Sequence, residues 1–183
     1  CFSEKIGEHF FNISPSSFFQ VNTQGAGVMA SLVKQALALQ GEETVLDLFA
    51  GVGLFSLVLS DGSVRITAVE SDPVSAGDAR RNTRCMSGIS VVTGEVRSVL
   101  ASRKNGADAV VADPPRKGCG REIVRIISAM NPKRIAVVSC DPATLARDTR
   151  LFIQEGFRLS FVQPLDLFPQ TYHIETVSLF RRD

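Results

Sequence analysis

The sequence predicts an α/β domain with a mostly parallel, doubly wound sheet, helices on both faces, and an antiparallel C-terminal hairpin at one sheet edge. Five apolar runs rich in β-branched residues alternate with stretches of helical spacing, which is the pattern of βαβ units. Two more strand-like runs close the chain with no helix between them, and they predict the hairpin. The length of 183 residues, with 44% hydrophobic and 21% charged residues, fits a single globular domain with a sizeable core.

The predicted elements follow one another in a regular order. A leading helix is expected over residues 22–39, with Asn22 or Thr23 as its N-cap. The alternating strands are expected at 43–51, 64–70, 90–95, 107–115 and 133–140, and the two terminal strands at 157–168 and 174–182. Helices are expected at 54–60, 73–85, 96–103 and 120–130, and from Pro142 onward. The chain starts at Cys1 rather than Met, and residues 1–21 are interpreted as a lead-in from a missing upstream region.

Composition excludes several classes of protein. The net charge of +1 gives no global electrostatic reason for binding nucleic acid, so any such reason must be local. The four cysteines, Cys1, Cys85, Cys119 and Cys140, lie far apart with no C-x-x-C pair, so neither a zinc site nor a disulfide framework is indicated. No apolar run is long enough to span a membrane, and a cytoplasmic location is expected.

The first predicted strand ends in DLFAGVG, residues 47–53, where two glycines allow a ligand to approach the backbone. This is not the dinucleotide fingerprint G-x-G-x-x-G, because Ser56 occupies the position of the third glycine. Glu70 ends the second strand, where an acid can accept hydrogen bonds from two ribose hydroxyls. Together these features favour S-adenosylmethionine over NAD, and a tight turn without a ligand is the alternative.

The fourth predicted strand ends in VVADPPRKG, residues 110–118. The paired prolines are rigid and hold the preceding Asp113 in an extended conformation, so this acid is expected to point into a pocket. Arg116 and Lys117 could meet phosphate oxygens, or they could simply form a solvated turn. Taken alone, DPP suggests an amino-methyltransferase acting on adenine.

A cysteine closes the fifth predicted strand, in VVSCDPATLARD, residues 137–148. The free N–H groups of the helix beginning at Pro142 are expected to lower the pKa of the Cys140 thiol, although a buried structural cysteine is the alternative. Methylation at C5 of a pyrimidine needs a thiolate that adds to C6, and then a base that removes the C5 proton. FPQTYHIE, residues 168–175, offers His173 and Glu175 as candidate bases, and the alternatives are that Glu175 is a surface residue and His173 a loop histidine with a structural hydrogen bond.

Six stretches together resemble a known family: SFFQVN (17–22), LDLFAGVG (46–53), VE (69–70), DPPRKG (113–118), SCDPATLARD (139–148) and PQTYHIE (169–175). In this order they resemble the catalytic domain of the RNA uracil-5-methyltransferases, which make 5-methyluridine in transfer RNA and 23S ribosomal RNA. The resemblance implies a Rossmann-like, S-adenosylmethionine-dependent methyltransferase fold with its catalytic domain over residues 22–183. It also implies Cys140 as nucleophile, Glu175 as proton acceptor, and cofactor contacts from Gln20, Phe49, Glu70 and Asp113. Glu95 falls where the family has an acid near the adenine, usually Asp, and Gly51 is expected from the glycine-rich turn to lie against the cofactor.

The chain departs from the family pattern at two places. Asp141 stands where many members have Asn, and its carboxylate is expected to oppose thiolate formation; Leu54 stands where a polar residue often contacts the cofactor. Family members carry upstream domains, some with an iron–sulfur cluster, so the RNA substrate is expected to be bound mainly by an upstream domain absent here, and the protein to be a monomer. An amino-methyltransferase using the DPP loop and a non-catalytic cofactor-binding module are the alternative functions.

Overall fold

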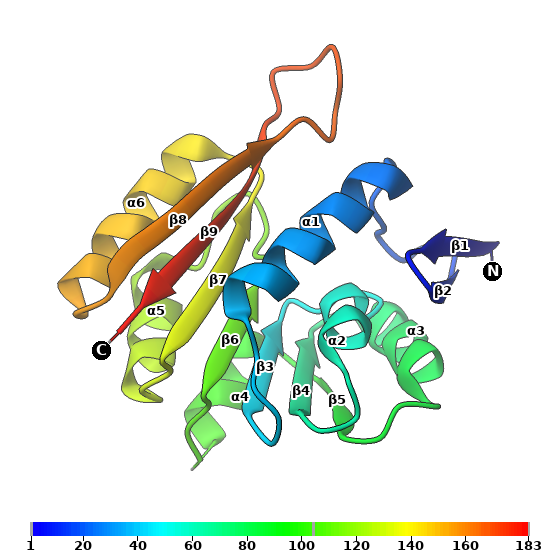
Figure 1. Cartoon of the computed structure of the whole chain (residues 1–183), viewed down its shortest axis with the longest axis horizontal. Coiled ribbons are helices and arrows are strands. Elements are labelled where there is room, and N and C mark those ends of the chain that lie inside the picture. Colours follow the sequence, from blue (N-terminus) through cyan, green and yellow to red (C-terminus); the bar gives the residue numbers. More distant parts are fainter. Residues whose placement is uncertain (1, 104, 183) are drawn as a thin grey trace.

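The computed structural model describes residues 2–103 and 105–182, so Cys1 lies outside the described residues. A seven-stranded sheet with the order β5-β4-β3-β6-β7-β9-β8 forms the centre of the molecule (Figure 1). Strands β3 to β7 are parallel, whereas β9 runs antiparallel to both β7 and β8. The predicted C-terminal hairpin is therefore confirmed, with β8 at the edge. The strands are β3 (Thr44–Leu48), β4 (Arg65–Glu70), β5 (Ile89–Thr93), β6 (Ala109–Ala112), β7 (Arg134–Ser139), β8 (Arg158–Leu165) and β9 (Glu175–Arg181).

Two apolar clusters cover the two faces of this sheet. In β6, Ala109 and Val111 pack into the cluster with α1 and α2, whereas Val110 and Ala112 pack into the cluster with α4, α5 and α6. Because both faces are buried, the central strands are continuous apolar runs, which is why they were recognisable in the sequence. The helices are α1 (Thr23–Leu37), α2 (Leu54–Leu59), α3 (Pro73–Thr83), α4 (Val96–Ser102), α5 (Gly120–Ala129) and α6 (Pro142–Gln154).

The lead-in contains an element that the sequence analysis did not predict. Strands β1 (Phe2–Ile6) and β2 (His9–Ile13) form a separate antiparallel hairpin beside α1 (Figure 1). Phe11 and Ile13 of this hairpin are fully buried in the same apolar cluster as α1. Residues before position 22 thus contribute to the core on this face of the sheet.

Helix α3 holds this hairpin and the segment after it. Asn82 accepts a hydrogen bond from the backbone N–H of Asn12 at 2.8 Å and donates to the Val52 carbonyl at 3.0 Å. Asp78 accepts from the N–H of Ser14 at 2.7 Å and from the Ser17 hydroxyl at 2.7 Å. One helix face therefore ties the lead-in to the glycine-rich loop after β3.

The boundaries of α1 follow from local chemistry. Asn22 is the N-cap, as expected, and accepts a hydrogen bond from the N–H of Gly25 at 2.9 Å. The helix ends at Leu37 because Ala38 adopts a left-handed conformation with φ of 43°. No helix in the described part of the chain is both long enough and apolar enough to cross a bilayer.

Candidate active site

The predicted site residues converge on the carboxyl edge of the sheet. Phe49 and Gly51 follow β3, Glu70 ends β4, Asp113 follows β6 and Cys140 follows β7. The chain starts the parallel sheet at β3, adds β4 and β5 on one side, and then crosses to add β6 and β7 on the other. The edge between β3 and β6 is a topological switch point, where open α/β sheets bind their ligands.

The loop after β3 has an unusual backbone. Phe49 has a φ of 61° and Gly51 a φ of 53°, both in the left-handed region. A bulky residue in that region costs about 1–3 kcal/mol and is found mainly at functional sites. A Cβ placed on Gly51 would meet no atom within 4 Å, so open space lies above this backbone. The loop thus offers its backbone to a ligand.

Glu70 is fixed next to this loop. One of its carboxylate oxygens accepts a hydrogen bond from the N–H of Gly51 at 2.8 Å, and the other accepts from the N–H of Asp72 at 2.7 Å. Gly94, which directly follows β5, donates a hydrogen bond from its N–H to the carbonyl of Glu70 at the end of β4, at 2.8 Å. Glu95 follows directly at the N-terminus of α4, where it is exposed and makes no side-chain capping bond.

Asp47 and Gln20 carry buried oxygens that no hydrogen bond satisfies. Oδ1 of Asp47 and Oε1 of Gln20 have no partner in the described part of the chain. The other oxygen of Asp47 accepts a bond from the Ser56 hydroxyl at 2.6 Å. Burial raises the pKa of Asp47 to about 6. The charge of Glu70 raises this pKa further, whereas the hydrogen bonds from Ser56 lower it. Since buried polar atoms are almost always paired, these oxygens fit a ligand that donates hydrogen bonds.

Asp47 was not among the residues predicted for the site. A signal was present, because a carboxylate interrupts the otherwise apolar strand VLDLF. Leu54, by contrast, is buried in the core cluster with α1, so a polar contact from that position is absent in this chain.

Cys140 directly follows β7, and Glu175 begins β9, the strand that pairs with β7. Their neighbours Ser139 and Thr176 are partners in the antiparallel register of β7 and β9. Burial raises the pKa of the Cys140 thiol above its ordinary value, and the negative charge of Glu175 raises it further. The prediction that α6 gives this thiol a lowered pKa is therefore wrong, because partial burial and the charges of Glu175 and Asp113 raise the pKa.

Asp141 has a structural role at this point. It is the N-cap of α6 and accepts a hydrogen bond from the N–H of Thr144 at 2.6 Å. The pKa of the Asp141 carboxyl is held below its usual value by the bonds from Thr144. The groups that raise the pKa of Cys140 are Glu175 and Asp113, not Asp141. Asp141 therefore caps α6 and does not raise the pKa of the Cys140 thiol as expected. An Asn could cap the helix in the same way.

Asp113 completes a cluster of acids with Glu175. The N–H of Asp113 bonds to the Leu48 carbonyl at 3.2 Å, which fixes the start of the DPP loop against β3. Burial raises the pKa of Asp113 to about 8, and the charges of Glu175 and Asp47 add to this effect. Burial also raises the pKa of Glu175, whose side chain is only 4% exposed. At neutral pH Asp113 therefore keeps its proton, and its negative charge raises the pKa of Cys140 only once the pH exceeds about 8.

The loop that precedes β9 reaches the DPP loop. Arg116 Nη2 and His173 Nε2 lie 3.4 Å apart, and the Arg116 carbonyl accepts a bond from the Thr144 hydroxyl at 3.1 Å. The rings of Tyr172 and His173 are in contact, with centroids 4.2 Å apart. His173 thus stands beside Arg116 at the rim, whereas Glu175 is the candidate proton acceptor near Cys140.

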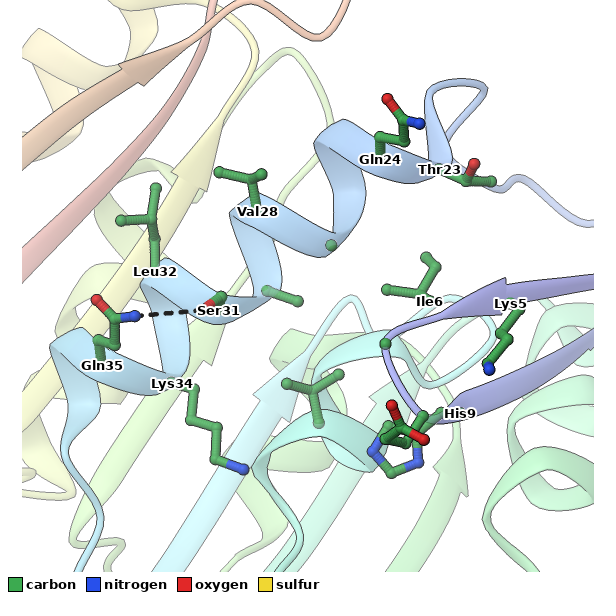
Figure 2. A pocket seen from close by; sticks show the side chains of 15 residues that line it. Lys5, Ile6, His9, Thr23, Gln24, Val28, Ser31, Leu32, Lys34 and Gln35 are labelled. Carbon is green, nitrogen blue, oxygen red and sulfur yellow. Dashed lines mark hydrogen bonds between the residues drawn. The ribbon is translucent and has the colours of Figure 1, made fainter.

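A wide groove of about 750 Å³ lies elsewhere on the molecule. Figure 2 shows α1 on one side of it and the hairpin of β1 and β2 on the other, with Lys5, His9 and Lys34 among its lining side chains. None of the predicted site residues lines this groove. The candidate active site is therefore assigned from the convergence of titratable groups and not from the size of a groove.

Two family profiles match different parts of the chain. The profile described as TRM5/TYW2 methyltransferase domain matches residues 18–123, which is more than half of the chain. The chain belongs to the TRM5/TYW2 methyltransferase domain family. The profile described as tRNA (Uracil-5-)-methyltransferase matches residues 100–183 of this methyltransferase domain.

Relatives and solved structures agree with this family. A Thermotoga maritima protein named as an uncharacterized RNA methyltransferase is 42% identical over 176 residues, covering 94% of this chain and 40% of the relative. A Bacillus cereus protein with the same name is 40% identical over 182 residues, covering 97% of this chain and 40% of the relative. The methyltransferase domain thus spans about two-fifths of the length of these relatives. An RNA methyltransferase family is confirmed for the chain.

The fold has a solved counterpart. The crystal structure of Pyrococcus abyssi tRNA (uracil-54, C5)-methyltransferase in complex with S-adenosyl-L-homocysteine superposes with a TM-score of 0.85. The two chains are 29% identical, and the match covers 98% of this chain and 44% of the other. The predicted Rossmann-like methyltransferase fold is confirmed.

Proposed function

We propose that this methyltransferase domain methylates carbon C5 of a uridine in a structured RNA, either a transfer RNA or a ribosomal RNA, through a covalent bond between Cys140 and C6. One observation carries the proposal: a cysteine and a buried carboxyl group lie next to one another across β7 and β9, with Ser139 and Thr176 as register partners. A thiol and a base are the two groups that C5 methylation requires. Transfer of a methyl group to nitrogen requires no thiol.

The division between the two profile matches supports the same chemistry. The match to the tRNA (Uracil-5-)-methyltransferase profile covers Cys140 and Glu175, whereas the match to the TRM5/TYW2 methyltransferase domain ends at residue 123. The residues proposed for uracil chemistry therefore lie in the part of the chain that matches the uracil-5 profile.

S-adenosylmethionine is the expected cofactor, and when bound it supplies an electrophilic methyl group. The two unsatisfied buried oxygens and the open space above Gly51 fit a ligand with an amino group and hydroxyl groups. Glu70 would hold the ribose hydroxyls, since its carboxylate is fixed at the loop after β3. The residues that we expect to hold the cofactor are Gln20, Asp47, Phe49, Gly51, Glu70, Glu95 and Asp113.

The proposed reaction balances through two residues of the chain. Cys140 gives up its proton to solvent, and its thiolate bonds to C6, which moves the electron pair of the double bond to C5 and the adjacent carbonyl oxygen. That electron pair then bonds C5 to the methyl group, and the cofactor would leave as S-adenosylhomocysteine. Glu175 removes the C5 proton, and the released electrons restore the double bond and expel the thiolate of Cys140. A raised pKa suits Glu175 to this role, because a more basic carboxylate is a better proton acceptor.

Identifying the methylated nucleoside tests this proposal. The natural protein is incubated with S-adenosylmethionine and RNA from a strain that lacks its gene, and the RNA is then digested and separated by chromatography. We expect 5-methyluridine with the wild type and with the matched control Cys85→Ala, whose cysteine is exposed, and none with Cys140→Ala.

Two results separate the alternatives. A methylated amino group on a base, formed equally well by Cys140→Ala, would identify an amino-methyltransferase that uses the DPP loop. Binding of S-adenosylmethionine without any methyl transfer to RNA would identify a non-catalytic cofactor-binding module.

A further inference from the structure

A basic groove lies between α5 and α6, outside the candidate active site. It has a volume of about 470 Å³ and is lined by Arg121 of α5 and by the face of α6 that carries Arg147 and Arg150. Ala143 and Ala146 form part of its floor, and both are exposed. Small side chains between the arginines leave room for a ligand to approach the helix closely.

This groove is continuous with the rim of the active site. Arg147 donates a hydrogen bond to the Lys117 carbonyl at 2.6 Å, and Thr144 donates to the Arg116 carbonyl at 3.1 Å. Cys140 lies just before α6, and the first turn of this helix includes Ala143, which lines the groove. An RNA strand that enters the candidate active site past Arg116 would therefore continue directly into this groove.

The charge on this surface is positive because its acids are already engaged. Asp148 is buried and accepts from the N–H groups of Cys119 at 2.7 Å and Gly120 at 3.3 Å. Glu122 pairs with Arg97 at 3.0 Å. Within the described part of the chain, Arg121 and Arg150 make no ion pair or hydrogen bond in the structure, and both are exposed.

Arg147 pairs with Asp148 at 2.9 Å, and four further cations lie along this surface in a chain whose net charge is only +1. They are Arg116, Lys117, Arg121 and Arg150. From Pro142 to Arg150 the helix rises about 12 Å, which is longer than a single phosphate group and suits a row of phosphates. Phosphate contacts of this kind position a nucleic acid without reading its sequence.

We propose that the α5–α6 groove binds backbone phosphates of the RNA substrate on the side of the target uridine, with Arg121 and Arg150 as the main contacts. The inference rests on the proposed function for its ligand, because that function makes RNA the substrate. It adds a binding surface within this domain, outside the residues that bind the cofactor or react with the uridine.

The test compares a double variant, Arg121→Gln with Arg150→Gln, with the matched control Arg84→Gln, which changes an exposed arginine at the end of α3. Binding of a labelled, unmodified transfer RNA transcript is measured by filter retention at several salt concentrations, and methylation of the same RNA is measured in parallel. We expect the double variant to raise Kd and KM for RNA roughly tenfold and to reduce the salt slope by about 1 to 2, because each lost phosphate contact lowers the slope by about 0.7 to 0.9. We also expect kcat at saturating RNA and the affinity for S-adenosylmethionine to stay unchanged, and Arg84→Gln to behave as wild type.

The variant with Lys at both positions retains the charges and is expected to restore most of the salt slope. Equal RNA affinity and equal salt slope in wild type and double variant would overturn this inference even if 5-methyluridine forms. A wild type that binds RNA through the groove yet makes no 5-methyluridine would instead contradict the proposed function, while the salt slopes still support the groove. Loss of S-adenosylmethionine binding in the double variant would contradict the inference that Arg121 and Arg150 bind only the RNA.

Discussion

Replacing Asp113 by Asn removes a carboxyl group that keeps its proton to about pH 8 in the folded protein. In the unfolded chain the same group ionises near its ordinary pKa of 3.8. Between these two values the folded state binds one proton more than the unfolded state, so the free energy of unfolding falls as the pH rises. The wild type therefore loses stability through this window, and the loss is complete above about pH 8.

The magnitude follows from the proton count. One proton difference changes the free energy of unfolding by about 1.4 kcal/mol for each pH unit. Asp113→Asn lacks this dependence, whereas Asp47 and Glu175 titrate in both proteins. The stability of Asp113→Asn relative to wild type should therefore increase by about 2–3 kcal/mol between pH 5 and pH 7.

Urea unfolding followed by circular dichroism at pH 5, 6, 7 and 8 measures this difference. Asp166→Asn serves as the matched control, because Asp166 is an exposed carboxylate in the connection between β8 and β9, and it should show no such trend. A relative stability of Asp113→Asn that stays constant from pH 5 to pH 8 would refute the argument, since it would mean that Asp113 ionises normally in the folded protein.

Three further outcomes are expected. Glu70→Ala should weaken binding of S-adenosylmethionine by about 1.5–3 kcal/mol in calorimetry, the range of a charge-assisted hydrogen bond, and unchanged affinity in a folded variant would remove Glu70 from the site. Alkylation of Cys140 by iodoacetamide should need a higher pH than alkylation of free cysteine, and Glu175→Gln should move alkylation of Cys140 toward lower pH, as site-resolved mass spectrometry can measure; an unchanged pH dependence would exclude a charge effect of Glu175 on the thiol. Asp78→Ala should lower the free energy of unfolding by about 2–4 kcal/mol in urea, because buried donors of the lead-in lose their acceptor, and a loss under 1 kcal/mol would contradict this role.

The sheet could be predicted from the sequence because its central strands are buried on both faces. β6 and β7 are uninterrupted apolar runs, and the acid or cysteine that ends each one marks the carboxyl edge of the sheet. Asp113 and Cys140 were therefore predictable as neighbours from strand order alone. Glu175 followed from the expected hairpin, since it begins the strand that pairs with β7.

The hairpin of β1 and β2 was not predictable in this way. Its strands are short and carry charged residues, and it is held by Asp78 and Asn82 of α3, far along the chain. Its burial is thus a tertiary effect with no local pattern in residues 2–13.

The direction of the Cys140 pKa was missed for a related reason. The sequence shows the helix that follows the cysteine, and a helix N-terminus favours a thiolate. It does not show that Glu175 and Asp113 are brought beside the thiol by the strand order, and their charges act in the opposite direction. Asp47 was missed because a single acid in an apolar strand gives no indication of the unsatisfied oxygen that the folded protein contains.

Trapping of the covalent RNA–protein bond tests the central claim most directly. In the proposed order, Cys140 bonds to C6 and C5 is methylated before Glu175 removes the proton, so Glu175→Gln should stall after the covalent bond has formed. With the natural protein, RNA and S-adenosylmethionine, Glu175→Gln should accumulate an adduct that migrates slowly on a denaturing gel and has the mass of protein, RNA and one methyl group. Cys140→Ala and the double variant should give no adduct. An adduct that survives Cys140→Ala, or 5-methyluridine formed at the wild-type rate by Glu175→Gln, would contradict the account.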